Sequence, residues 1–255
     1  MTDPRKILIT GASGLIAGFA IKALKESCEL TLVDLDDTAF VDCIALDLRI
    51  DSQTLDDLCS THDMIIHLAF SKDHTDDIKM AENVYRAAMK ADSKPSVIMA
   101  SSIHAVGGYW DWQKEPYRSI LNKQASAETL KNALIGIDRP LYPNSVYGAS
   151  KGYLELLGKH YADQGLQVVV VRYGGVTHEL DFFEKEPGFH SIWFSHGDTI
   201  HFFQCLVKAE ITQQYSVIFA TSKNRFGIHD LGPAEQLLNY TASDDGSEQD
   251  YKNEL

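Results

Sequence analysis

A tyrosine and a lysine stand four residues apart in the segment Tyr147-Gly148-Ala149-Ser150-Lys151. At that spacing in a helix the two side chains share one face, so that a phenol can lie beside an ammonium. A tyrosine is a poor base at neutral pH, but a cation about 4 Å away contributes on the order of 4 kcal/mol at an effective dielectric of about 20. We therefore predict that Lys151 lowers the pKa of Tyr147, which then takes a proton from a substrate hydroxyl.

A second polar cluster, Ser101-Ser102-Ile103-His104, follows an apolar run that predicts a strand over 96–100. Side chains in that position lie at the carboxyl edge of a parallel sheet, where open α/β sheets bind their ligands. We predict that Ser102 hydrogen-bonds the reacting oxygen and that His104 contacts the substrate. For His104, a purely structural role in a loop is an equally good interpretation of the sequence.

The run Thr10-Gly11-Ala12-Ser13-Gly14-Leu15-Ile16-Ala17-Gly18 connects the first expected strand to the first expected helix. Glycines there allow a tight turn and a close approach to a pyrophosphate, and the helix start offers free N–H groups. Asp34 follows 23 residues after Gly11, at the end of the second expected strand, where an acid binds the adenosine ribose. Its carboxylate accepts from a 2′-hydroxyl and repels a 2′-phosphate, so the sequence favours NAD over NADP.

The elements that position these residues alternate along the chain. Apolar runs predict strands at 6–10, 30–33, 43–46, 64–68, 96–100, 167–172 and 215–219. Helical periodicity predicts helices at 15–24, from about Ser52, and at 76–91, 125–134, 148–162 and 198–208. This alternation predicts an α/β fold, a doubly wound parallel Rossmann-type sheet with helices on both faces. We expect one domain over 1–240, a small substrate lobe from 103–146 and 173–240, and a flexible acidic tail over 241–255.

Composition excludes several classes of function. The 255 residues carry 36 acidic and 23 basic side chains, a net charge of −13, which disfavours nucleic acid and anionic membranes as partners. The apolar runs are too short to cross a bilayer. Four scattered cysteines indicate reduced thiols, and we expect a cytoplasmic protein. The spacing of His190, His196 and His201 does not suit a metal, so no metal site is predicted; Asp198 is expected near a helix start instead.

Together the motifs resemble the short-chain dehydrogenase/reductase superfamily, and within it the extended, NAD-dependent epimerase/dehydratase branch. The motifs are Thr10-Gly11-x-x-Gly14, Asp34, Asp47-Leu48, His67-Leu68-Ala69, Ser101-Ser102 and Tyr147-x-x-x-Lys151. The stretch Ser191-Ile192-Trp193-Phe194-Ser195-His196-Gly197-Asp198 is similar to the uronate dehydrogenase group within that branch. The superfamily resemblance covers nearly the whole chain, whereas the similarity to the group rests on a few short motifs.

The resemblance implies roles for individual residues. Tyr147 would be the catalytic base, Lys151 would lower its pKa and bind the nicotinamide ribose, and Ser102 and His104 would face the substrate. The remaining cofactor contacts that it implies are Gly11, Ser13, Gly14, Leu15 and Ile16 near the pyrophosphate, Asp34 at the ribose, Asp47 and Leu48 at the adenine, and Leu68 and Ala69 beneath the cofactor. A homodimer through the helices 76–91 and 148–162 is also implied.

The sequence departs from the group at four places. The third glycine of the fingerprint is Ala17, a mild change. Ile103 stands where the group has an asparagine after the serine, and Gly175 where it has a serine. Between 177 and 193 the basic residue is Lys185 and not an arginine, and lysine cannot copy the bidentate contact of a guanidinium with a carboxylate. The last three departures remove polar or charged side chains that the resemblance implies for binding a hexuronate.

Three functions agree with these motifs. The first is an NAD-dependent oxidoreductase that acts on a hydroxyl of a small sugar or sugar acid. The second is a nucleotide-sugar epimerase or dehydratase with tightly bound NAD, against which the short C-terminal part argues. The third is an NAD-binding sensor without turnover, against which the complete set of Tyr147, Lys151 and Ser102 argues.

Overall fold

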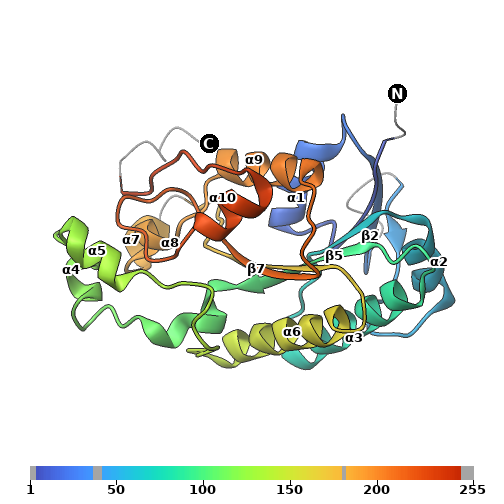
Figure 1. Cartoon of the computed structure of the whole chain (residues 1–255), viewed down its shortest axis with the longest axis horizontal. Helices are drawn as coiled ribbons and strands as arrows, with labels where there is room; N and C mark the ends of the chain where they lie inside the picture. Colours follow the sequence, from blue (N-terminus) through green and yellow to red (C-terminus); the bar gives the residue numbers. More distant parts are fainter. Residues whose placement is uncertain (1–3, 37–41, 180–181, 248–255) are drawn as a thin grey trace.

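The computed structural model describes residues 4–36, 42–179 and 182–247. Within these ranges a single seven-stranded sheet, parallel throughout, runs through the centre of the molecule (Figure 1). The strands are β1 (Lys6–Thr10), β2 (Glu29–Asp34), β3 (Ile44–Ala45), β4 (Met64–His67), β5 (Ser96–Ser102), β6 (Val168–Tyr173) and β7 (Tyr215–Ala220). Their order is β3-β2-β1-β4-β5-β6-β7. Strands are therefore added first on one side of β1 and then, from β4 onward, on its other side. The predicted doubly wound Rossmann-type sheet is confirmed.

The inner strands β4 and β6 are buried along their whole length because helices cover both of their faces. All six residues of β6, with the sequence VVVVRY, are buried, as are all four of β4. Ser102 at the end of β5 pairs with Tyr173 at the end of β6, and Thr10 pairs with His67 at the same edge. Among the described residues, no helix has the length and apolarity needed to cross a membrane.

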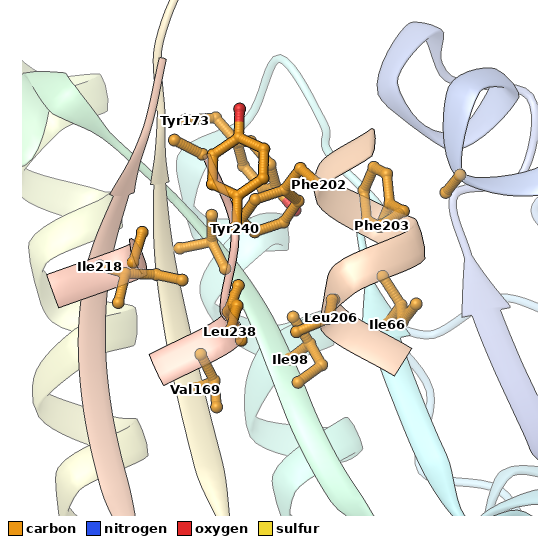
Figure 2. Packing of buried hydrophobic residues seen from close by; sticks show 14 of the residues in the cluster. Ile66, Ile98, Val169, Tyr173, Phe202, Phe203, Leu206, Ile218, Leu238 and Tyr240 are labelled. Carbon is orange, nitrogen blue, oxygen red and sulfur yellow. The ribbon is translucent and has the colours of Figure 1, made fainter. Parts of the chain in front are cut away.

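One face of the sheet is covered by α1 (Leu15–Leu24), α9 (His196–Lys208) and α10 (Gly232–Leu238) (Figure 1). Figure 2 shows Phe202, Phe203 and Leu206 of α9 packed beside Leu238, over Ile98 and its neighbours on the sheet. Ser195 caps α9 by accepting a hydrogen bond from the Asp198 N–H at 2.9 Å, so the expected helix start near Asp198 is confirmed.

The opposite face is covered by α2 (Gln53–Thr61), α3 (His74–Lys90) and α6 (Val146–Ala162) (Figure 1). Two serines begin helices here. The Ser52 hydroxyl accepts from the Leu55 N–H, as expected, and the Ser145 hydroxyl accepts from the Gly148 N–H at 3.0 Å. The second cap places Tyr147 in the first turn of α6, at the carboxyl edge of the sheet.

The long connection between β5 and α6 is an ordered part of the molecule. It contains a 3-10 helix η1 (Ile103–Tyr109) and the short helices α4 (Tyr117–Leu121) and α5 (Ala127–Ala133). Its apolar side chains form a third core with residues of β7 and of the segment that follows β7: Ile103, Val106, Tyr117, Ile120, Ala133, Ile135, Phe219, Phe226 and Ile228. The helices α7 (Phe182–Lys185) and α8 (Phe189–Ile192) lie at the same end of the molecule (Figure 1).

Within the stretch predicted to be a flexible tail, the described residues 241–247 hydrogen-bond to the rest of the molecule. The buried Asp198 carboxylate at the start of α9 accepts from the N–H groups of Ser243 and Asp244, at 2.9 and 3.0 Å. The Gly246 N–H donates to the Asn224 side chain at 2.9 Å. The stretch thus donates backbone N–H groups to buried acceptors, and Asp245 within it accepts from the Arg225 N–H at 3.0 Å. Residues 248–255 of the predicted tail lie outside the described residues.

A buried ion pair fastens α6 to the sheet. Arg172 of β6 donates from Nε and Nη2 to the two oxygens of Glu155 of α6, at 3.0 and 2.8 Å, and the Ser101 hydroxyl of β5 donates to the same carboxylate at 2.5 Å. Both charged side chains are at most 4% exposed. Since α6 carries Tyr147 and Lys151, this pair fixes the helix on which both predicted catalytic residues lie.

Replacing Glu155 by leucine leaves the Arg172 guanidinium buried without its anion. We expect the free energy of unfolding to fall by about 3–5 kcal/mol, which urea denaturation measures. In the double variant Glu155→Leu/Arg172→Met no charge is left unpaired, and most of that loss is expected to be recovered. A single variant as stable as the wild type would contradict this view of the pair.

Candidate active site

The predicted site residues lie along the carboxyl edge of the sheet, at the point where the strand order reverses. Two cavities that share Gly14, Leu68 and Phe70 as lining residues extend along this edge. One, of about 330 Å³, is lined by Gly11, Ser13, Gly14, Asp34, Asp47, Leu48, Leu68 and Ala69. The other, of about 1260 Å³, is lined by Gly14, Leu15, Ile16, Leu68, Ser102, His104, Tyr147 and Lys151. The structure therefore brings together every residue that the sequence predicted for the site.

The glycine-rich turn is shaped for close approach. Gly11 has φ +72°, and a Cβ there would lie 2.5 Å from backbone atoms of Ala69, so the position requires glycine. The helix α1 begins after Gly14 without any side-chain cap, unlike α2, α3, α6 and α9, each of which has a serine or aspartate cap. Its first residues, Leu15 and Ile16, line the larger cavity. Uncapped N–H groups at a helix start fit an anion such as a pyrophosphate.

Asp34 is held against this turn. One oxygen of its carboxylate accepts from the backbone N–H and the hydroxyl of Ser13, at 2.8 and 2.7 Å, and the other accepts from the Leu35 N–H at 2.7 Å. The acid is thereby fixed at the mouth of the smaller cavity, where the adenosine ribose of a dinucleotide would lie. The donor and acceptor groups of this cavity fit NAD.

Arg49 is a residue of the smaller cavity that the sequence interpretation missed. It donates from Nε and Nη2 to Asp47, at 2.8 and 2.7 Å, and from Nη1 to Asp76 at 3.2 Å. The hydrogen bond from Arg49 lowers the pKa of Asp47. The guanidinium thus has two carboxylate partners, and it fixes the side chain predicted to contact the adenine. No helical or strand periodicity relates Arg49 to Asp76, so the sequence carries no signal for this contact.

The pair of Tyr147 and Lys151 lies in the larger cavity as predicted. The Lys151 side chain is about 95% buried, and its Nζ lies 5.7 Å from the centroid of the Tyr147 ring and 5.0 Å from that of Phe70. The start of α6 packs tightly on η1, because a Cβ at Gly148 would lie 2.2 Å from the carbonyl oxygen of His104. This contact sets the position of the Tyr147 ring relative to the His104 ring, whose centroid is 6.0 Å away.

Asp77 is the second residue that the sequence interpretation missed. It lies on α3, is 1% exposed, and places Oδ2 at 3.8 Å from the Lys151 Nζ, while Oδ1 accepts from the Ser71 N–H at 2.6 Å. Burial lowers the pKa of Lys151, and the Asp77 charge raises it. Burial in turn raises the pKa of Asp77, which Lys151 lowers. A buried ammonium thus has a buried carboxylate as its partner.

Several influences act on the pKa of Tyr147, in opposite directions. Burial raises the pKa of its phenol, the hydrogen bond with Ser102 lowers it, and the charge of Asp77 raises it. Together these effects raise the pKa of Tyr147, and Lys151 is not among their causes, so the prediction that Lys151 lowers this pKa is wrong: burial dominates, and the lysine is itself paired with Asp77. Ser102 thus interacts with the Tyr147 phenol. From this position its hydroxyl could hydrogen-bond the same alcohol oxygen as the phenol.

The substrate side of the larger cavity is apolar at two positions where the resemblance stated above implies polar side chains. Ile103 is 1% exposed and belongs to the third core. At Gly175 a Cβ would lie 2.3 Å from the ring of Phe189, so an aromatic ring lies where a serine side chain would have to extend. His104 faces the cavity, where its Nδ1 hydrogen-bonds the Asn144 Oδ1 at 3.2 Å, and burial lowers its pKa.

The sequence matches the NAD dependent epimerase/dehydratase family over residues 7–187, which is most of the chain. The chain belongs to this family. It is thus an enzyme of the NAD-dependent dehydrogenase and epimerase type, and the predicted superfamily and branch are confirmed.

Members of the family with named activities are similar to the chain at modest identity. The L-arabinose 1-dehydrogenase (NAD(P)(+)) of Haloferax volcanii is 26% identical over 258 residues, 95% of this chain and 98% of that protein. The NAD-dependent glucose-6-phosphate dehydrogenase of the same organism is 31% identical over 158 residues, 61% of this chain and 55% of that protein. The crystal structure of uronate dehydrogenase from Agrobacterium tumefaciens has a TM-score of 0.73 at 25% identity and covers 95% of this chain and 86% of that one.

The charge of Asp77 can be removed with little change in shape by Asp77→Asn. The titratable groups that interact with Asp77 are Lys151 from α6 and His74 and Asp76 from its own helix. The charge of Asp77 also raises the pKa of Tyr147. Lys151 in turn lowers the pKa of His67 of β4. Because Asp77 raises the pKa of both Lys151 and Tyr147, we expect its loss to move both limbs of the pH profile of turnover toward lower pH.

The matched control is Glu82→Gln, which neutralises an exposed carboxylate on the same helix that accepts from the Tyr153 hydroxyl. Its pH profile should be that of the wild type. A reduced rate with an unmoved profile in Asp77→Asn would assign the carboxylate a packing role only.

Proposed function

We propose that the protein is an NAD-dependent oxidoreductase that oxidises a hydroxyl of a small sugar or sugar acid, with Tyr147 as the catalytic base. The observation that supports this most directly is that Tyr147, Lys151 and Ser102 line the same cavity as the uncapped start of α1. The proposed proton acceptor and the proposed dinucleotide site would thus share one cavity. The names of the three similar proteins, all of them dehydrogenases of sugars or sugar derivatives, support the same class of reaction.

The proposed chemistry divides between the cofactor and the protein. NAD, when bound, supplies the acceptor for the hydride that leaves the carbon of the alcohol. Ser102 holds the hydroxyl of the substrate by a hydrogen bond, and the Tyr147 oxygen takes its proton. Lys151 stabilises the phenolate by its charge and donates to the nicotinamide ribose. Asp77 keeps Lys151 protonated inside the protein, where burial alone would favour the neutral amine.

We also propose NAD as the preferred dinucleotide. The support is the fixed carboxylate of Asp34, which would repel a 2′-phosphate, and the engagement of Arg49 with Asp47 and Asp76. Residues 103–146 and 173–240 form the substrate lobe in this proposal, since both segments line the larger cavity. The homodimer through α3 and α6 stays a prediction, supported by the exposed Tyr153 and Leu156 on α6. The cytoplasmic location also stays a prediction.

The replacement Tyr147→Phe removes the proton acceptor and keeps the ring. We expect kcat for NAD-dependent sugar oxidation to fall by about 10²- to 10⁴-fold, because general base catalysis contributes that much, while the affinity for NAD stays within about threefold. Turnover is followed by NADH absorbance and NAD affinity by calorimetry. Unchanged turnover would remove Tyr147 from its proposed role, and conversion of nucleotide sugars alone would favour the epimerase.

The replacement Asp34→Ala removes the proposed ribose acceptor. We expect NAD to bind about 10- to 100-fold more weakly, because hydrogen bonds to a charged group contribute about 1.5–3 kcal/mol, and discrimination against NADP to decrease. The control is Asp36→Ala, which removes an exposed carboxylate two residues further on. Dissociation constants for both dinucleotides test this, and a preserved preference for NAD in Asp34→Ala would contradict the assignment.

A further inference from the structure

Neutral sugars, uronates and sugar phosphates differ in charge. The charged and apolar side chains that line the larger cavity therefore favour some of these substrates over others. From its charged and aromatic lining we infer that the substrate is a neutral sugar, and not a uronate or a sugar phosphate. The inference rests on the proposed function and narrows its substrate class.

The positive charges on the described cavity wall are already paired with acids. Lys114 lies 3.0 Å from Asp111, and its side chain is 79% exposed. Lys151 is paired with Asp77 at the cofactor side. Glu186 adds an unfavourable charge on the wall for an anion. Residues 180 and 181, adjacent in the chain, are Leu and Asp and add no positive charge to the sequence there.

The arginines around the substrate lobe have other partners. Arg172 at the end of β6 is engaged by Glu155 inside the core. Arg118 donates to Glu115 at 2.9 Å, and Arg139 lies over the ring of Tyr109 with its guanidinium carbon 5.0 Å from the ring centroid. A carboxylate or a phosphate is bound most strongly by a bidentate guanidinium. Within the described ranges, the cavity lining contains no arginine.

Aromatic rings form much of the wall instead: Trp110, Trp112, Tyr142, Phe182 and Phe189. Two of these rings pack directly on glycines. A Cβ at Gly188 would lie 2.4 Å from the Trp112 ring, and a Cβ at Gly175 would lie 2.3 Å from the Phe189 ring. Rigid aromatic faces suit the apolar C–H faces of a sugar ring. Together with Ile103, they make this wall apolar where a charged substituent would need polar partners.

The polar groups that remain are suited to hydroxyls. Ser102, Tyr147 and the amide of Asn144 can each donate and accept hydrogen bonds without charge. The His104 ring, hydrogen-bonded to Asn144, completes this set. The net charge of −13 for the whole chain further disfavours anionic substrates by long-range repulsion.

The test compares sugars of matched stereochemistry and different charge: D-galactose with D-galacturonate, D-glucose with D-glucuronate and glucose 6-phosphate, and L-arabinose as a smaller neutral sugar. We expect a neutral sugar to have a kcat/KM at least about tenfold above that of its charged counterpart, which corresponds to about 1.4 kcal/mol. A preference for the charged member of a pair would overturn the inference and leave the proposed function intact. If NAD binds and every sugar is inert, the proposed function itself fails, and the inference with it.

A charge-reversal variant tests the electrostatic basis directly. Glu186→Arg places a cation on the cavity wall, and we expect the ratio of kcat/KM for charged over neutral sugars to rise at least about threefold. The matched control is Glu184→Arg, on α7 and exposed, where the ratio should not change. NAD affinity, measured by calorimetry, should stay constant in both variants. A ratio that is unmoved in Glu186→Arg, or that moves equally in the control, would contradict the inference.

Discussion

The buried ammonium of Lys151 is the constraint on which the site depends. A charge enclosed among apolar groups is costly unless an anion lies nearby, and Asp77 provides that anion at 3.8 Å. The same ammonium must also serve Tyr147 and the nicotinamide ribose in the proposed reaction. Three elements therefore have to meet within a few ångströms: α3, which carries the acid, α6, which carries the tyrosine and the lysine, and the edge of β5, which carries Ser102.

Several contacts keep α6 in the required position. Its start is fixed by the Ser145 cap and by the absence of a side chain at Gly148, and its middle by the ion pair between Glu155 and Arg172. The substrate wall, by contrast, is built from the 103–145 connection and the segment before α9, which rest on a core of their own. Catalytic geometry and substrate choice thus belong to different parts of the structure.

The sequence was sufficient for what local patterns determine. The strands, the main helices and the edge on which the site lies follow from periodicity and from turn residues such as Gly11, and the family was identified from short motifs. Asp77 and Arg49 were missed because each acts through a residue distant in the chain, Lys151 and Asp76 respectively. The acidic stretch after 240 looks disordered by composition, yet Asp198, buried in the first turn of α9, binds its backbone N–H groups. Composition does not show such acceptors.

The distribution of charge along the crevice separates its two halves. At the half proposed to hold the cofactor, α1 begins without a side-chain cap, and Lys151 lines the same cavity as Leu15 and Ile16 of that helix. At the substrate half, Asp111 neutralises Lys114, Glu186 adds a negative charge, and much of the remaining wall is aromatic. An anionic group is therefore stabilised in the first half and not in the second. In the proposed function, this division of charge would let one crevice hold the phosphates of a dinucleotide in one half and an uncharged sugar in the other.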